Sequence, residues 1–463
     1  MFRIMCSGCV GAVMLFNFKH IVYSRHGDAP HIYPSCASRG GGYTRSILYK
    51  SHLSKSDDHI NGLGNLTSQA IATPGLSMLY PLVFCTQSGS VCQLTVGEGE
   101  INSAVSMTAL VLSRSFNFTQ TYFLLAGIAG VNPRHATIGS VAFARYAVQV
   151  ALQYEIDSRS LPEDWPTGYI PYGRAHPFEY PCITYGTEVF ELNANLRDAA
   201  HAFAQRAQLQ DAQETRKYRL LYSEMGPPYH TAVMPPSVVK CDSATSDVYY
   251  TGGRLAQAFE NTTSLWTNGT GVYCMSAQED NATLEVLVRA AIEGLVDFSR
   301  VIAMRTGEQY PSINTYIIYL IQTYIFIHTE YHISTNKNTP GSNFDRPPPS
   351  RTDWEHLTHT NQNGFHIAIA NLYAAGIQVV RGILADWDCT FARGVSPSNY
   401  IGDIFGSLGG HPDFGFGSIT GGRKLRAAES RRGRRRDSQN VVSLAGVEMA
   451  RRRTFGAKGA MKM

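Results

Sequence analysis

An apolar run turns through two glycines into a polar segment at Thr95-Val96-Gly97-Glu98-Gly99-Glu100-Ile101-Asn102-Ser103-Ala104. We expect a strand over residues 92–96, before this turn, and a helix over residues 101–113, after it. The first backbone N–H groups of such a helix can face an anion or another polar ligand. A tight strand-to-helix turn needs the same two glycines for its backbone alone, so both interpretations stay open.

Short apolar runs alternate with amphipathic segments on both sides of this stretch, a pattern typical of an α/β fold with a largely parallel sheet. Further strands are expected over residues 79–85, 121–125, 139–150, 187–192, 238–240, 248–250, 272–276 and 300–305. Further helices are expected over residues 196–211, 253–265, 281–296 and 363–387.

Three segments lack this alternation of apolar runs and amphipathic segments. Residues 1–70 show no sustained periodicity and are interpreted as a poorly structured N-terminal extension. Residues 307–341 are rich in Ile, Tyr, Thr and Asn without amphipathic spacing and form an atypical insertion. Residues 423–463 form a basic tail, interpreted as disordered. The folded domain is therefore predicted to span residues 71–422.

The charge of the chain is unevenly distributed. The 463 residues, 44% hydrophobic and 16% charged, carry a net charge of +4. The tail over 423–463 holds +10 of this, so the rest of the chain carries −6. A mildly acidic body argues against a nucleic-acid partner, because binding needs basic side chains to neutralise phosphates.

Two apolar runs, residues 4–18 and 313–327, are the candidates for a membrane span. The first is short and the second is interrupted by polar residues, whereas a spanning helix needs about 20 apolar residues. We therefore predict no membrane-spanning segment, and leave membrane association open.

The cysteines and sequons bear on the compartment. No cysteine pair has the spacing of a metal site, so no metal is expected. Cys85 and Cys92 flank a turn-rich segment, and the expected hairpin either joins them in a disulfide or leaves two unpaired thiols. Five Asn-X-Thr sequons and an apolar start favour the cell surface or the secretory route over the cytoplasm.

Polar groups follow two other expected strands, where an open α/β sheet gathers its ligand-binding residues. Glu279 and Asp280 stand at a helix start, where carboxylates either complement the helix dipole or accept hydrogen bonds from sugar hydroxyls. Asp247 precedes Tyr249, whose ring offers a face for a planar base. The glycines of Leu125-Ala126-Gly127-Ile128-Ala129-Gly130 permit close backbone approach, or packing alone.

Taken in order, these segments resemble the fungal purine nucleoside permease family, whose members are similar in fold to the nucleoside phosphorylase and nucleosidase superfamily. The resemblance covers residues 71–306 and 342–422. It is carried by Thr95-Val96-Gly97-Glu98-Gly99-Glu100-Ile101-Asn102, Phe123 to Ala144, Tyr185-Gly186-Thr187-Glu188-Val189-Phe190, Cys274-Met275-Ser276-Ala277-Gln278-Glu279-Asp280-Asn281-Ala282-Thr283 and Phe344-Asp345-Arg346-Pro347.

The resemblance implies a three-layer α/β/α sandwich with a mixed, partly barrel-like central sheet. It also implies a purine nucleoside, adenosine or guanosine, as ligand, without a cofactor but with phosphate as a candidate co-substrate. A homo-oligomer is a further candidate assembly. The implied substrate-binding residues are Gly97, Gly99, Asp247, Tyr249, Glu279 and Asn281.

Catalysis is the second function that the resemblance raises. A Ser-Asp pair is expected to protonate the leaving purine, but this chain has Ser342-Asn343, and an asparagine cannot act as a general acid. Asn343 and the nearby Asp345 are the catalytic candidates. Three hypotheses follow: a protein of purine nucleoside binding and uptake, a purine nucleoside phosphorylase or nucleosidase, and a family member with the fold but no activity.

Overall fold

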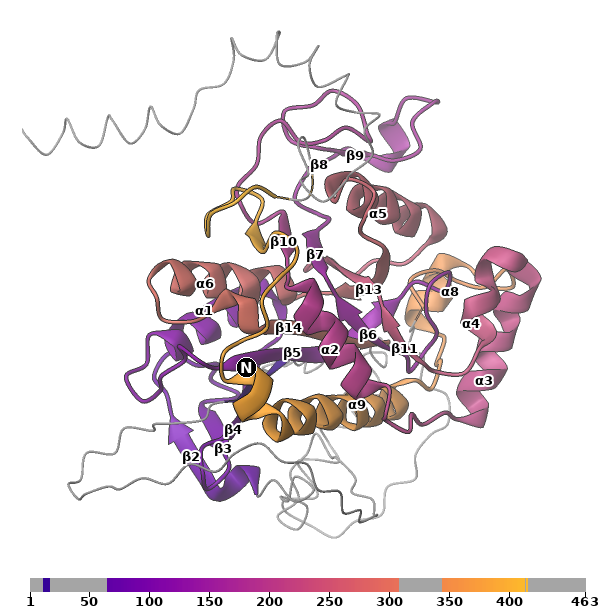
Figure 1. Cartoon of the computed structure of the whole chain (residues 1–463). Coiled ribbons are helices and arrows are strands. Elements are labelled where there is room, and N and C mark those ends of the chain that lie inside the picture. Colours follow the sequence, from indigo (N-terminus) through magenta and orange to yellow (C-terminus); the bar gives the residue numbers. More distant parts are fainter. Residues whose placement is uncertain (1–10, 17–64, 308–343, 413, 415–463) are drawn as a thin grey trace, which may run out of the picture.

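The central strand β5, Tyr122–Val131, is buried along its whole length and organises the sheet (Figure 1). A computed structural model of the chain describes residues 11–16, 65–307, 344–412 and 414. Asn343, most of the 307–341 insertion and the basic tail lie outside the described residues. Strand β5 pairs in parallel with β14, Val301–Gly307, and antiparallel with β1, Gly11–Phe16, and β13, Tyr273–Ala277.

Within the described residues, thirteen strands form one sheet, with the path β15-β10-β7-β12-β13-β5-β1-β4-β3-β2 and a branch through β14, β6 and β11. The remaining strands of this sheet are β2 Gln69–Ala72, β3 Leu82–Cys85, β4 Val91–Gly97, β6 Val141–Ala144, β7 Tyr146–Gln149, β10 Val189–Glu191, β11 Val238–Lys240, β12 Asp242–Thr245 and β15 Gly402–Asp403. Strands β8, Tyr154–Glu155, and β9, Tyr169–Ile170, form a separate small hairpin.

The sheet is mixed, with more antiparallel pairings than parallel ones. The largely parallel sheet expected from the alternation of segments is therefore wrong. The mixed sheet implied by the resemblance is confirmed. The order of strands and helices along the chain does not show which strands pair or in which direction, so the alternation could not predict the antiparallel pairings.

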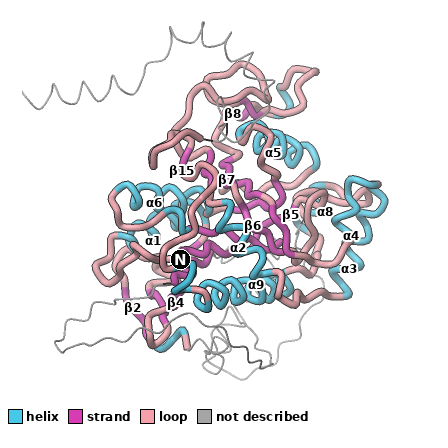
Figure 2. Tube along the Cα trace, in the orientation of Figure 1, coloured by secondary structure: helices cyan, strands magenta, loops and turns pink. Residues whose placement is uncertain are grey.

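Helices cover both faces of the sheet, so the fold has three layers (Figure 2). Helices α1, Gly99–Val111, and α6, Asp280–Ile292, contact each other and pack on one face. Helices α2, Ala194–Ala204, and α9, Phe365–Ala385, pack on the other. The other described α-helices are α3 Gln213–Arg219, α4 His230–Val233, α5 Gly253–Trp266 and α8 Asp353–Thr358.

Side-chain alternation along β5 explains the two cores. Phe123 and Leu125 join the core under α1 and α6, whereas Tyr122 and Leu124 join the core under α2 and α9. Successive side chains of a strand point to opposite faces, so a strand buried on both faces is apolar at every position. The three-layer α/β/α arrangement follows from this double burial.

Helix α9 is, in the described part of the chain, the one helix long and apolar enough to cross a membrane by length and composition. Of its apolar window, 61% is buried, and the helix packs on β14 and β5. The two apolar runs named from the sequence as candidate spans do not include α9. Residues 11–16 of the run over 4–18 form β1, and the run over 313–327 lies outside the described residues.

Several boundaries differ from those expected. The strand expected over 139–150 is two strands, because the backbone N–H groups of Arg145 and Tyr146 both donate to Asp242 Oδ1, at 2.9 Å, between β6 and β7. No strand forms over 248–250, and β12 lies a few residues earlier. Strand β1 and the start of β2 fall inside residues 1–70, where we expected little structure.

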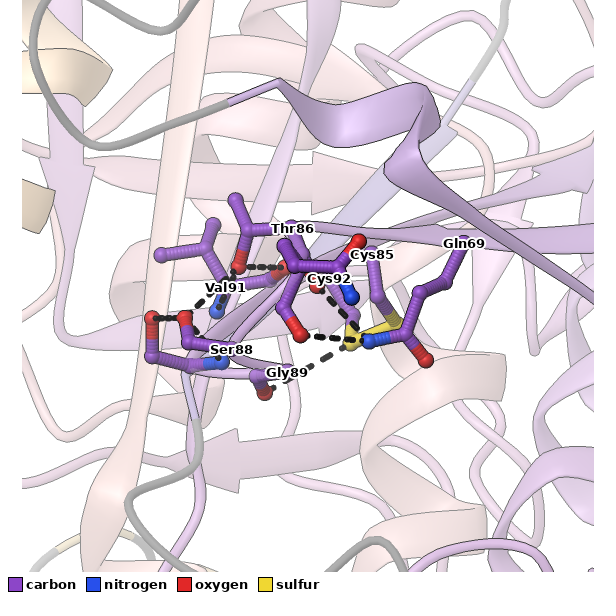
Figure 3. Close-up of a disulfide and its surroundings, with 9 residues drawn as sticks. Gln69, Cys85, Thr86, Ser88, Gly89, Val91 and Cys92 are labelled. Atoms are coloured by element: carbon purple, nitrogen blue, oxygen red, sulfur yellow. Dashed lines mark hydrogen bonds between the residues drawn. A yellow bond between two sulfur atoms is a disulfide. The ribbon is translucent and has the colours of Figure 1, made fainter.

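The hairpin of β3 and β4 contains a disulfide between Cys85 and Cys92, which face each other in register (Figure 3). The turn between them is closed by hydrogen bonds from the Val91 N–H to Thr86 Oγ1 and from Thr86 Oγ1 to the Val91 carbonyl, both 3.3 Å. A second disulfide, which was not expected from the sequence, joins Cys241 and Cys274. The first bridge fixes β4 just ahead of the glycine turn.

Candidate functional site

The glycine turn between β4 and α1 needs both of its glycines. Gly97 and Gly99 have φ values of +92° and +79°, in the left-handed region that side chains with a Cβ rarely adopt. A Cβ at Gly99 would lie 3.2 Å from Asp247 Oδ1, and one at Gly97 would lie 3.0 Å from the Asn102 Cβ. The turn therefore lets α1 begin in close contact with residues from distant parts of the chain.

Two carboxylates accept hydrogen bonds from the first N–H groups of α1. The Gly99 N–H donates to Glu279 Oε1 at 3.2 Å, and the Glu100 N–H donates to Asp247 Oδ1 at 2.9 Å. The first N–H groups of a helix have no partner inside the helix, so these carboxylates satisfy them and complement the helix dipole. The structure thus brings Gly99, Asp247 and Glu279 together.

Beneath this contact lies a buried ion-pair cluster. Arg305 of β14 donates through Nε to Asp280 Oδ1 at 3.0 Å and through Nη2 to Glu279 Oε2 at 3.2 Å. Ser243 Oγ donates to Asp280 Oδ2 at 2.7 Å. Burial raises the pKa of Glu279, the positive charge of Arg305 opposes that rise, and Asp280 adds to it. The cluster fixes the Glu279 carboxylate at the N-terminus of α1.

Arg305 was missed as a site residue in the sequence. It is the one charged residue of the buried strand Val-Ile-Ala-Met-Arg-Thr-Gly over residues 301–307. A single charge inside a buried strand is itself a signal, because a buried charge must be paired. Two adjacent carboxylates at Glu279 and Asp280 were the partners that this signal required.

Asn281 lies next to the ion-pair cluster and is bonded within the protein. Its Oδ1 accepts from Thr245 Oγ1 at 2.7 Å, and its Nδ2 donates to the Thr187 carbonyl at 2.7 Å. These contacts tie the start of α6 to β12 and to the segment before β10. The amide of Asn281 thereby positions the strands around Glu279.

A groove of about 550 Å³ runs between α1 and α6, a size typical of small-molecule sites. Its lining includes Glu100, Gln149, Thr187 and Asn281. The Gln149 amide donates to the Glu100 carboxylate. Burial, together with the negative charges of Asp247 and Glu279, raises the pKa of Glu100 to about 7. Glu100 belongs to the glycine turn, but the sequence did not identify it as a site residue.

Tyr249 lies at a smaller hollow, of about 20 Å³, together with Tyr250, Gly130, Ser276 and Gln278. The ring of Tyr249 is 38% exposed and its neighbour Val248 is 62% exposed. Tyr250 is buried, and its hydroxyl donates to the Tyr273 hydroxyl at 2.8 Å. The hollow has the volume of about one water molecule, so it is too small for a purine. A purine could stack on Tyr249 only if the loop over 246–250 moved outward.

Asp345 lies in a buried cluster of charged and hydroxyl groups. Its buried carboxylate accepts from Arg346 Nε at 2.6 Å and from the Tyr273 hydroxyl at 2.8 Å. Arg346 Nη2 also donates to Glu260 Oε1 at 2.8 Å. The residue lines neither the groove nor the small hollow, so these contacts give Asp345 a part in holding the chain that follows the insertion. The described residues hold no group of three His, Cys, Asp or Glu placed to bind a metal ion.

Comparison with known proteins adds the family. The model of the family described as purine nucleoside permease matches residues 54–317 and 339–396. A purine nucleoside permease of Candida albicans is 44% identical over 351 residues, which cover 74% of this chain and 77% of that protein. A protein of Schizosaccharomyces pombe named "Probable purine nucleoside permease" is 35% identical over 350 residues, covering 74% of this chain and 87% of that protein.

Among solved structures, a futalosine hydrolase of Helicobacter pylori aligns with a TM-score of 0.36 and 11% identity, over 71% of this chain and 91% of that one. A 5′-methylthioadenosine/S-adenosylhomocysteine nucleosidase of Neisseria meningitidis aligns with a TM-score of 0.35 and 11% identity, over 68% and 91%. The family match and the fungal relatives span most of the chain. The chain belongs to the purine nucleoside permease family.

Proposed function

We propose that this chain binds purine nucleosides and takes part in their uptake into the cell. The observation that carries the proposal is the contact of Gly99 with Glu279 and of Glu100 with Asp247. In a family of purine nucleoside permeases, a buried carboxylate held at a helix start and the exposed Tyr249 supply the two kinds of contact that a nucleoside needs. Glu279 accepts hydrogen bonds from the ribose hydroxyls, and the Tyr249 ring stacks on the base.

Nucleoside binding of this kind changes the hydrogen bonds of Glu279 and the position of the loop over 246–250. Glu279 Oε1 accepts from Gly99 and Oε2 from Arg305, so ribose hydroxyls share acceptors that are already engaged. Carboxylate oxygens accept more than one hydrogen bond, which makes this sharing feasible. Because the hollow at Tyr249 is small, the base enters as the loop over 246–250 moves outward.

Glu279→Gln tests the ribose contact, since it removes the charge and keeps the size of the side chain. Hydrogen bonds to charged groups contribute about 1.5–3 kcal/mol each, so adenosine and guanosine should bind at least tenfold more weakly in calorimetry. The matched control is Glu214→Gln, at an exposed carboxylate of α3 that pairs with Lys217 outside the groove. Unchanged affinity in a folded Glu279→Gln variant would make Glu279 a helix-capping residue only.

Uptake is the second part of the proposal and needs its own measurement. Cells lacking purine nucleoside uptake, complemented with the chain, should accumulate labelled adenosine, and the Glu279→Gln variant should lower that accumulation in step with its affinity. Binding without uptake would restrict the function to a nucleoside-binding protein. Residence at the cell surface or in the secretory route is part of the same proposal, and surface labelling of intact cells checks it.

One observation favours cleavage of the nucleoside as a second candidate. The Glu100 pKa of about 7 gives the groove a carboxyl group able to gain or lose a proton at neutral pH. Purine release is measured with and without phosphate, in the native chain and in Asn343→Asp, which restores an acid beside Phe344. A positioned general acid contributes about 10² to 10⁴-fold in rate. No release under any of these conditions would remove the enzyme candidate.

A homo-oligomer stays a prediction, and no described contact bears on it. Sedimentation of the purified chain, with and without adenosine, measures the mass of the assembly. A mass of one chain in both conditions would contradict it.

A further inference from the structure

The five sequons of the chain differ in what surrounds them. They are Asn65-Leu66-Thr67, Asn117-Phe118-Thr119, Asn261-Thr262-Thr263, Asn268-Gly269-Thr270 and Asn281-Ala282-Thr283. A sequon is an acceptor for N-linked glycan only where a large, hydrated sugar can leave the surface. The folded structure therefore separates sequons that can carry a glycan from those that cannot.

Asn281 is closed to a glycan. The residue is 2% exposed, and both ends of its amide are bonded to Thr245 and Thr187. Thr283 is also buried, with its hydroxyl 2.6 Å from Ser103 Oγ. A sugar on the Asn281 nitrogen would break the contact to Thr187 and displace the start of α6, which holds Glu279.

Asn117 is open to a glycan. It lies in the loop between α1 and β5, and both Asn117 and Thr119 are exposed. Phe118 between them is buried and bridges to Val296, so the loop is anchored through the middle residue while its neighbours stay at the surface. The Thr119 N–H and hydroxyl both donate to Asn117 Oδ1, at 3.1 and 2.8 Å. The amide oxygen and the threonine hydroxyl of the sequon thus lie together at the surface.

The disulfides are a second and independent observation. Cys85 is bonded to Cys92, and Cys241 to Cys274, within the described residues. Disulfides form and persist in oxidising compartments such as the lumen of the endoplasmic reticulum and the cell surface. N-linked glycans are attached to secreted proteins along that same route. Two unrelated features of the chain therefore indicate one compartment.

We propose that Asn117 carries an N-linked glycan and that Asn281 is left unmodified. The Asn117 amide nitrogen bonds to C1 of the first sugar of a lipid-diphosphate-linked oligosaccharide. The bond from C1 to the diphosphate oxygen breaks, the lipid diphosphate leaves, and the amide nitrogen loses one proton. No atom is oxidised or reduced in this transfer.

The glycan lies far from the glycine turn and Glu279. Helix α1 has 13 residues, so at 1.5 Å per residue its C-terminal end lies about 20 Å from the glycine turn. Asn117 follows that far end. Modification of Asn117 is therefore compatible with nucleoside binding at Glu279, and its loss should leave affinity for adenosine unchanged.

The experiment uses the full chain, expressed from its own gene and purified from the cells that encode it. Trypsin cleavage after Arg114 and Arg134 isolates Asn117 in one peptide. After reduction of the bridge to Cys241, cleavage after Arg254 and Arg289 gives a second peptide that holds Asn261, Asn268 and Asn281, and its fragment ions locate the label among these three. Peptide N-glycosidase in heavy-oxygen water converts a glycosylated asparagine into labelled aspartate. We expect the label at position 117 and none at position 281.

Matched variants separate the glycan from spontaneous deamidation. Thr119→Ala removes the sequon and should abolish the label at Asn117, whereas Thr119→Ser keeps the sequon and should retain it. An unlabelled Asn117 in the native chain overturns the proposal, and so does a label that persists in Thr119→Ala. A label at Asn281 overturns the assignment of that site as closed.

Discussion

The backbone N–H of Gly99 donates to Glu279 Oε1 at 3.2 Å, across 180 positions of the sequence. This contact closes the gap between the start of α1 and the start of α6, the two helices that lie together on one face of the sheet. It depends on a backbone shape that glycine adopts easily and on a carboxylate fixed by Arg305. Both conditions can be tested separately.

Gly99→Ala should destabilise the fold. The φ of +79° is strained for alanine, and the new Cβ would lie 3.2 Å from Asp247 Oδ1, so the free energy of unfolding should fall by about 1–3 kcal/mol. Urea unfolding measures the change. The matched control is Gly253→Ala at the start of α5, where a Cβ meets nothing within 4 Å. Equal stability of the two variants would contradict the role given to the turn.

Arg305→Met should destabilise the fold more strongly. Removing the guanidinium leaves Glu279 and Asp280 buried without their cation, which typically costs about 3–5 kcal/mol. The control Arg289→Met breaks an exposed pair with Glu285 on α6, worth about 0.3–0.5 kcal/mol. Chemical unfolding measures the loss of unfolding free energy in each of the two variants. A loss at Arg305 no larger than the loss at Arg289 would show that the cluster does not hold the site.

The sequence predicted the glycine turn, the strand before it and the helix after it because local patterns carry that information. It did not predict the break between β6 and β7, which arises when Asp242, nearly 100 positions away, accepts two backbone N–H groups. The antiparallel pairing of β5 with β13 was missed for the same reason, since strand partners are set by tertiary contacts. Glu279 was selected by its place after a strand, whereas the single charge of Arg305 in a buried strand indicated an ion pair but not which carboxylates complete it.

The two disulfides should contribute unequally to stability. In the chain-entropy description, a bridge across 33 positions contributes about 4 kcal/mol and one across 7 positions about 2.5 kcal/mol. The double variant Cys241→Ser, Cys274→Ser should therefore unfold at lower urea than Cys85→Ser, Cys92→Ser. Cys182→Ser, at an exposed cysteine outside both bridges, is the control. Freely alkylated thiols at these four cysteines in native protein would contradict the bridges.

Stability should depend on pH through Glu100. Its folded pKa of about 7 lies above the ordinary value of 4.5, because burial and the charges of Asp247 and Glu279 disfavour the carboxylate. The folded chain then binds more protons than the unfolded chain between these pH values. Stability from the neutral Glu100 is full below about pH 4.5 and declines as the pH rises toward 7.

Glu100→Gln should remove that part of the pH dependence, because glutamine does not titrate. Urea midpoints at pH 5.5 and 7.5 compare the variant with the native chain, which should lose more stability over the interval. Glu285→Gln on α6 is the control for a change of net charge. Parallel pH curves for native chain and Glu100→Gln would show that Glu100 titrates as an ordinary exposed carboxyl.

Tyr249 provides the final prediction, which rests on the proposed nucleoside site. Base–aromatic stacking contributes about 1–3 kcal/mol per base, so Tyr249→Ala should weaken adenosine binding roughly five- to a hundredfold, while Tyr249→Phe keeps the ring and most of the affinity. Val248→Ala, at an exposed neighbour in the same loop, controls for loop mobility. Equal affinities in Tyr249→Ala and Tyr249→Phe would place the base elsewhere, with the groove beside Glu100 as the next position to test.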